Sequence, residues 1–338
     1  MHRRGFLALT GSALTAVALQ AIVADTPRLA AVARGRHGLD EQVVTDLERL
    51  AELRRGMDDQ LGGGALHDAL TSDLRLVTQL LSNTSYPEGL GNRLYAVAAE
   101  LARLAGWCCH DAGAQGAAQR HWLVALRAAE QAQDRALGAH VLTVMGVQAA
   151  AVGNLRESIT LYNSAKHIAG TSLGATQRAV IAGVSAGAYA RSGDARETAA
   201  QADETFTYLE QSRPENDPPW IVYWGTKAQL SGDAGAAFLH LGDPTKAVPH
   251  LRTAVDNLPP SCVRDRAHRR IRLATAQLRT GDADHALATA HEATDIASRL
   301  SSGKVRDILG DFCREATGTL GNPAAAALVD HARTTVKL

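Results

Sequence analysis

Four side chains that could bind a ligand or move a proton follow one another at helical spacing. Glu100, Arg103, Trp107 and His110 stand at i, i+3, i+7 and i+10, which places them on one face of an α-helix. A carboxylate, a guanidinium, an indole and an imidazole on one face could hold a polar ligand against an aromatic surface. The structural alternative makes Glu100 and Arg103 a solvated ion pair and Trp107 a core residue.

Equivalent faces later in the chain add further candidates. His140, Gln229 and His268 hold the position that Glu100 holds in its own segment, and a Pro-rich segment, 212–224, adds three aromatic side chains. We expect these residues to bind a peptide or a small molecule. The ligand-binding candidates are Glu100, Arg103, Trp107, His110, His140, Trp220, Tyr223, Trp224, Gln229 and His268.

Catalysis is the competing interpretation of the same residues. Glu100, His110, His140 and His268 could serve as general acids or bases. The GVSAG string around Ser185 matches GxSxG, but it lies in an expected helix without the strand that a nucleophile elbow requires. The sequence has no Walker A or dinucleotide fingerprint, and its thirteen histidines include no HExxH spacing. We expect no cofactor and no metal, and we favour binding over catalysis.

The charge composition argues against nucleic acid as the partner. Lys and Arg total 35 and Asp and Glu total 35, whereas a nucleic-acid-binding domain normally carries a basic excess. The arginine-rich run 264–272 could bind a carboxylate or phosphate; the alternative is a solvated helix face interleaved with acids such as Asp265. The four cysteines lack a CxxC spacing, so we expect buried, reduced thiols. They are Cys108, Cys109, Cys262 and Cys313.

The elements that must position these residues are repeated helix pairs. Five glycines recur at intervals of 40, 40, 49 and 39 residues, with small residues seven before and five and twelve after each. Self-similarity at such a period is typical of a solenoid. We predict two antiparallel helices per unit, the glycine in the turn, and the first helix on the concave face. The five are Gly113, Gly153, Gly193, Gly242 and Gly281.

The third unit departs from the others in a way that favours a ligand. Its inner helix presents only small residues, among them Gly183 and Gly187, and the 49-residue interval after it contains the aromatic segment 212–224. A groove with polar ends and a floor of small residues suits a peptide or a small amphipathic metabolite.

Helical periodicity covers nearly the whole chain. We predict an all-α fold, a tetratricopeptide-like helical-repeat superhelix or α-solenoid. Residues 1–38 form an N-terminal segment, 39–89 a helical pair, 90–300 five helix-turn-helix repeats, and 301–338 capping helices.

The N-terminus allows two interpretations. Arg3 and Arg4 precede an apolar stretch, as in a twin-arginine export signal, which would make the protein an exported repeat adaptor. We favour an amphipathic helix packed on the array of a cytoplasmic protein. No other stretch is long and apolar enough to predict a transmembrane helix.

The repeats resemble the tetratricopeptide repeat, lengthened from 34 to about 40 residues. RRGFLALTGSALT (3–15), LRRGMDDQLGGG (53–64), DPPWIVYW (217–224) and VRDRAHRRIRLA (263–274) resemble the C-terminal half of actinobacterial Cro/XRE-type helix-turn-helix regulators. The resemblance implies a sensor region that binds a ligand or a partner protein. It begins at the RRxFL segment, which follows the DNA-binding domain of those regulators, so we expect no direct nucleic-acid contact. Unmatched apolar faces at the solenoid ends would allow a homodimer.

Overall fold

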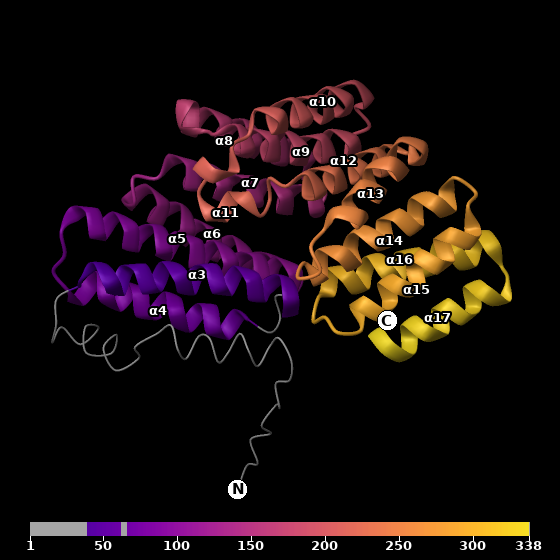
Figure 1. The fold of residues 1–338 in the computed structure, drawn as a ribbon, viewed down its shortest axis with the longest axis horizontal. Helices are drawn as coiled ribbons and strands as arrows, with labels where there is room; N and C mark the ends of the chain where they lie inside the picture. The colour runs from indigo at the N-terminus through magenta and orange to yellow at the C-terminus, as the bar shows by residue number, and fades with distance from the viewer. Residues whose placement is uncertain (1–38, 62–65, 338) are drawn as a thin grey trace, which may run out of the picture.

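The computed structural model describes residues 39–61 and 66–337, which form fifteen α-helices, two short 3₁₀ turns and no strand (Figure 1). The Arg3–Arg4 pair and the glycines at 62–64 lie outside the described residues. The α-helices are α3 (Glu41–Leu61), α4 (His67–Asn83), α5 (Glu88–Asp111), α6 (Gln115–Gln131), α7 (Arg135–Ala151), α8 (Leu155–Ala169), α9 (Ala175–Arg191), α10 (Ala195–Gln211), α11 (Pro219–Val222), α12 (Lys227–Leu241), α13 (Pro244–Asn257), α14 (Val263–Arg279), α15 (Ala283–Ala297), α16 (Gly303–Leu320) and α17 (Pro323–Val336).

Consecutive helices pack as pairs, which confirms the predicted all-α solenoid. The five predicted repeats are α5/α6, α7/α8, α9/α10, α12/α13 and α14/α15. Helix α4 packs on α5 before the first repeat, and α16 and α17 pack on the last pair. None of the described helices is long and apolar enough to span a membrane.

The turn glycines adopt a backbone conformation that glycine alone adopts readily. Their φ angles are +82°, +89°, +81°, +86° and +86°, in the left-handed region where a Cβ would be strained. Each therefore lets one helix end and the next begin within a few residues. The angles refer in order to Gly113, Gly153, Gly193, Gly242 and Gly281.

Close packing within a pair explains the small residue seven positions before each turn glycine. In three repeats, a large side chain nine positions after the turn lies directly against that small residue, where a Cβ would collide with it. The contacts fix the register of the two helices. They are Trp122 on Gly106, Tyr162 on Gly146 and Leu251 on Gly235.

Substituting one of these glycines should destabilise the fold. In Gly235→Val, the new Cβ would lie 2.6 Å from Leu251 Cγ and 3.1 Å from the Ala247 carbonyl oxygen. Because that backbone cannot move aside freely, we expect a loss of about 1–3 kcal/mol in the free energy of unfolding, measured in urea. Gly187→Ala is the matched control, since a Cβ there meets no atom within 4 Å. Equal losses in both variants would show that close packing is not the cause.

The superhelix closes on itself at two contacts. Arg264 Nη1 of α14 donates to Asp58 Oδ2 of α3 at 2.7 Å, across 206 residues. Ser302 Oγ, at the start of α16, donates to Asp111 Oδ1 at the end of α5 at 2.8 Å. Figure 1 shows α3 and α5 meeting the α14–α16 end of the molecule. The two ends of the array therefore meet across the concave face, which forms a partly open interior rather than the expected open groove.

The segment that interrupts the repeat folds into this interior. Trp220, on the short helix α11, is 8 % exposed, and its indole stacks on the His140 ring at 5.0 Å between centroids. Trp224 meets Trp107 edge to face at 5.1 Å. Aromatic rings thus fill part of the space that the sequence analysis left for a ligand.

Candidate functional site

Two adjoining cavities occupy the interior. We call the first, of about 170 Å³ and lined by helices that include α5, α9, α12 and α14, the aromatic cavity. The second, of about 670 Å³ and lined largely by α14, α16 and the end of α5, is the outer cavity. They share a set of lining residues, so a ligand could occupy both. The shared residues are Ala151, Arg191, His240, Arg272 and Lys304.

The aromatic cavity combines aromatic walls with a floor of glycines. Trp107, Tyr223 and Trp224 line it from α5 and from the interrupted repeat, and Gly183 and Gly187 line it from α9. An added Cβ at Gly187 would meet open space. The small-residue face expected on the third inner helix therefore borders this cavity, opposite surfaces suited to an apolar or aromatic group.

Two arginines of the run 264–272 are buried and neutralised. Arg264 lies 2.7 Å from Asp58, and Arg269 Nη2 lies 2.7 Å from Asp233 Oδ1. Their exposed fractions are 7 % and 6 %. The alternative of a solvated helix face is therefore wrong for these two residues, which fasten α14 to α3 and α12.

Arg272 and Lys304 have no such counter-charge. Within residues 39–61 and 66–337, no hydrogen bond or ion pair joins either side chain to a carboxylate. Lys304 Nζ lies 5.6 Å from the centre of a Trp107 ring, a cation–π contact. Beside them, Arg191 Nη2 lies 3.0 Å from His240 Nε2. We call Arg191, Arg272 and Lys304 the cationic junction.

Electrostatics at the cationic junction disfavour positive charge. Burial, followed by the charges of Arg269 and Arg191, lowers the pKa of Arg272 to about 9, against an opposing effect of Asp233. Burial and Arg272 lower the pKa of Lys304 to about 8, although Asp111 acts to raise it. A bound anion would relieve the repulsion at both groups.

Glu100 and Arg103 form a buried ion pair. Arg103 Nε lies 2.7 Å from Glu100 Oε2, and Arg55 Nε of α3 lies 3.0 Å from Glu100 Oε1. Burial acts to raise the pKa of Glu100, but Arg103 and Arg55 outweigh it and hold the pKa well below the ordinary value. The ion pair of the structural alternative is therefore present, but it is buried and not solvated, since Arg103 is only 1 % exposed.

Burial lowers the pKa of all three candidate histidines, which favours the neutral imidazole in each. His110 Nδ1 lies 2.9 Å from Gln115 Oε1, and burial lowers the pKa of His110 to about 4. Burial and Arg103 lower the pKa of His140 to about 3, and neither of its ring nitrogens has a partner among the described residues. Burial and Arg272 also lower the pKa of His268 well below its ordinary value.

The predicted binding residues do not form one site: they line three different cavities or are buried away from all three. Glu100 and Trp220 line a third cavity of about 420 Å³ beside α3, and His110 lines the outer cavity. Arg103 and His140 are buried and line none of these three cavities. The members that line the aromatic cavity together are Trp107, Tyr223, Trp224, Gln229 and His268.

The sequence does not predict the cationic junction as a group. Of its three members, only Arg272 belongs to a predicted binding segment, the run 264–272. Arg191 stands two residues before a turn glycine, and Lys304 lies beyond the repeats at the start of α16. No spacing relates these positions, because α16 follows the repeats and comes to lie against α14, the inner helix that carries Arg272, only in the folded structure.

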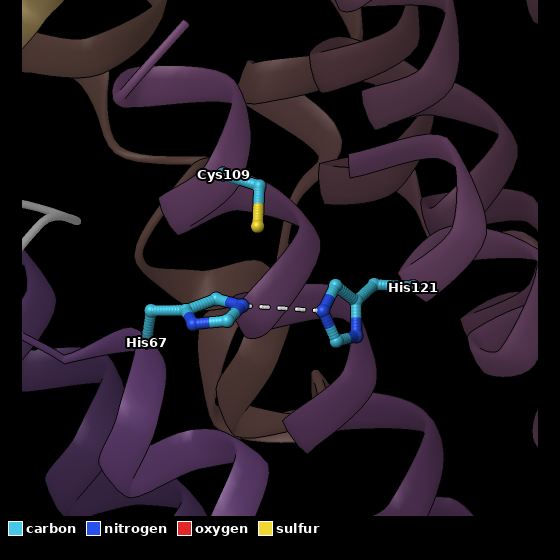
Figure 2. A group of neighbouring side chains, drawn as sticks. All are labelled: His67, Cys109 and His121. Carbon is cyan, nitrogen blue, oxygen red and sulfur yellow. Dashed lines mark hydrogen bonds between the residues drawn. The ribbon is translucent and has the colours of Figure 1, made fainter. Parts of the chain in front are cut away.

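A group of metal-binding side chain types lies outside these cavities. His67, Cys109 and His121 come from α4, α5 and α6, and their ligand atoms lie within 4.8 Å of one another (Figure 2). These residues stand 42 and 12 positions apart and form no familiar ligand motif, so their spacing predicts no metal site.

Comparisons with known proteins identify no family. No protein-family model and no curated protein sequence matches the chain. Among solved structures it is similar to BtubC (BKLC) from P. vanneervenii, with 14 % identity and a TM-score of 0.48 over 69 % of this chain and 89 % of that chain. It is similar to the apo form of RapI, with 12 % identity and a TM-score of 0.46 over 87 % of this chain and 86 % of that chain. It is also similar to the P58(IPK) TPR domain, with 11 % identity and a TM-score of 0.25 over 96 % of this chain and 98 % of that chain. Because these TM-scores lie below 0.5, the fold assignment rests on the helix pairing described above.

Proposed function

We propose that this chain is a ligand-binding tetratricopeptide-like protein, related to the sensor regions of Cro/XRE-type regulators. Its interior would take a small molecule or peptide that carries a carboxylate or phosphate. The observation that supports an anion is the cationic junction, where Arg272 and Lys304 lack the carboxylate partners that Arg264 and Arg269 have. Partly buried charges that no carboxylate pairs with directly are costly to the folded protein, and such sites are candidates for function.

The two cavities suggest the shape of the ligand. An anionic group between Arg272 and Lys304 would place the rest of the ligand either against Trp107 and Trp224 or in the outer cavity. The aromatic rings favour an apolar or aromatic portion. An amphipathic acid or a peptide with an acidic residue meets both requirements.

Thermal unfolding with defined anions tests the proposal. Citrate and 1-naphthoate, compared with chloride at equal ionic strength, are expected to raise the Tm saturably, because they bind only the folded state. Gly187→Leu, which fills the open space at the glycine floor, should abolish stabilisation by naphthoate while leaving that by citrate. No saturable shift with either anion would contradict the proposal.

Anion binding should weaken at alkaline pH. The pKa of Lys304 is lowered to about 8, so the free protein carries this charge below pH 8 and loses it above. A bound anion favours the charged form, so binding takes up a proton above the pKa. The affinity for citrate should then fall by up to about tenfold per pH unit above pH 8. Calorimetric titration from pH 6.5 to 9.5 measures this fall, and Lys304→Arg should move it to higher pH; an unchanged affinity across the range would contradict it.

Catalysis, the location of the protein and dimerisation stay predictions. Acid–base catalysis by Glu100, His110, His140 or His268 would show as turnover that is lost in a His110→Ala variant with an intact fold. A cytoplasmic location, an export signal and a homodimer are equally untested. Four large apolar side chains exposed outside the interior are the places to seek a protein contact. They are Leu123, Val124, Val152 and Ile168.

A further inference from the structure

We propose that His67, Cys109 and His121 form a binding site for Zn²⁺ that is independent of the ligand proposed for the interior. The three side chains converge from the start of α4, the end of α5 and the first half of α6 (Figure 2). Two imidazole nitrogens and a thiolate are ligands that Zn²⁺ prefers in proteins. They stand on three helices that pack on one another through α5, so the fold itself holds them together.

The distance between the two histidines matches zinc coordination. Their Nε2 atoms lie 3.3 Å apart, and two nitrogens bound tetrahedrally at 2.0–2.1 Å from Zn²⁺ would be about 3.3 Å apart. Figure 2 shows the Cys109 sulfur above the space between the two rings. All three ligand atoms already lie within 4.8 Å of one another, so a shift of about 1 Å would bring the sulfur to a Zn–S distance of about 2.3 Å.

Zinc binds a histidine as the neutral imidazole and a cysteine as the thiolate. Burial, followed by His67 and Arg120, lowers the pKa of His121, which favours the neutral imidazole. Burial raises the pKa of Cys109, while Arg120 acts to lower it. Zinc binding would therefore release the thiol proton, and the affinity would rise with pH.

A second pair of neighbouring histidines, His291 and His331, differs from the group of His67, Cys109 and His121 in its geometry. His291 and His331 lie 3.2 Å apart through their Nδ1 atoms, but their rings are stacked at 21°. The rings of His67 and His121 stand at 76°. His331 also has Asp295 Oδ1 at 3.2 Å from its Nε2, but within the described residues only His67, Cys109 and His121 bring three candidate ligand atoms within 4.8 Å of one another. The fourth position of a tetrahedral ion remains for water, since both rings are partly exposed.

Zinc titration of the full chain against a chromophoric chelator tests this site. We expect one zinc ion per chain, and a loss of affinity on the order of a hundredfold in Cys109→Ser and in His121→Asn. Cobalt in place of zinc should give a thiolate charge-transfer band that Cys109→Ser removes. His291→Asn is the matched control and should bind zinc like the wild type.

Several results would overturn the assignment. They are no zinc binding at micromolar concentration, unchanged affinity in both ligand variants, or a cobalt complex that lacks the thiolate band. Circular dichroism in the presence of chelator checks that the variants fold. Should Cys109→Ser fail this check, His67→Asn replaces it, because His67 is partly exposed at the start of α4.

Discussion

The double variant Arg272→Gln/Lys304→Gln is expected to unfold at a higher temperature than the wild-type protein and to lose all stabilisation by citrate. In the wild type, burial and mutual repulsion lower the pKa of both groups, which means that their charges oppose folding. Removing them should raise the free energy of unfolding by about 1 kcal/mol, allowing for solvent screening. Removing them also deletes the groups proposed to hold the anion.

Arg269→Gln provides the matched control for this gain. Arg269 stands on the same helix and borders the same cavity, but it is paired with Asp233 at 2.7 Å. Breaking that pair should lower stability, because it leaves a carboxylate without its partner. Differential scanning calorimetry with and without citrate measures both effects. If the double variant were destabilised as Arg269→Gln is, Arg272 and Lys304 would be structural.

Glu100→Gln is expected to cost about 3–5 kcal/mol in the free energy of unfolding, because it leaves the buried Arg103 and Arg55 without a counter-charge. Both arginines lie within 3.0 Å of the carboxylate. The pH dependence follows from the lowered pKa of Glu100. Its contribution is complete above the unfolded pKa of about 4.3 and declines as the pH falls from there towards the native pKa.

The exposed pair Arg93–Glu48 offers a control for this prediction. Their side chains are 35 % and 40 % exposed, so Glu48→Gln should change stability by less than about 1 kcal/mol. Urea unfolding at pH 7 and pH 3 compares the two variants. Wild-type stability in Glu100→Gln at pH 7 would contradict a structural role and would favour the acid–base interpretation of Glu100.

The repeat architecture could be predicted from the sequence because its signals are local. A glycine with positive φ, a small residue seven positions earlier and a large one nine positions later all act within one helix pair. The interior is different. The contact between Asp58 and Arg264 spans 206 residues, so it depends on the curvature accumulated over every unit between them.

The candidate site could be predicted where it follows the repeat or the segment that interrupts the repeat. Trp107 and His268 hold inner-helix positions, Tyr223 and Trp224 lie in the interrupting segment, and all four line the aromatic cavity. Glu100 holds the same type of position, yet α3 supplies Arg55 and turns it into part of an ion pair. Lys304 enters from outside the repeats. Which charged side chains pair across the superhelix depends on the tertiary structure, and the spacing of residues in the sequence does not predict it.

The central claim is that the cationic junction binds an anion, and selenate can locate that anion directly. Crystals grown with selenate, a divalent oxyanion with a strong anomalous signal, are expected to show the anion within hydrogen-bond distance of the Arg272 guanidinium and the Lys304 ammonium. Crystals of the Arg272→Gln/Lys304→Gln variant should lack that peak. An empty junction in the wild type, with selenate bound only at exposed arginines, would contradict the account.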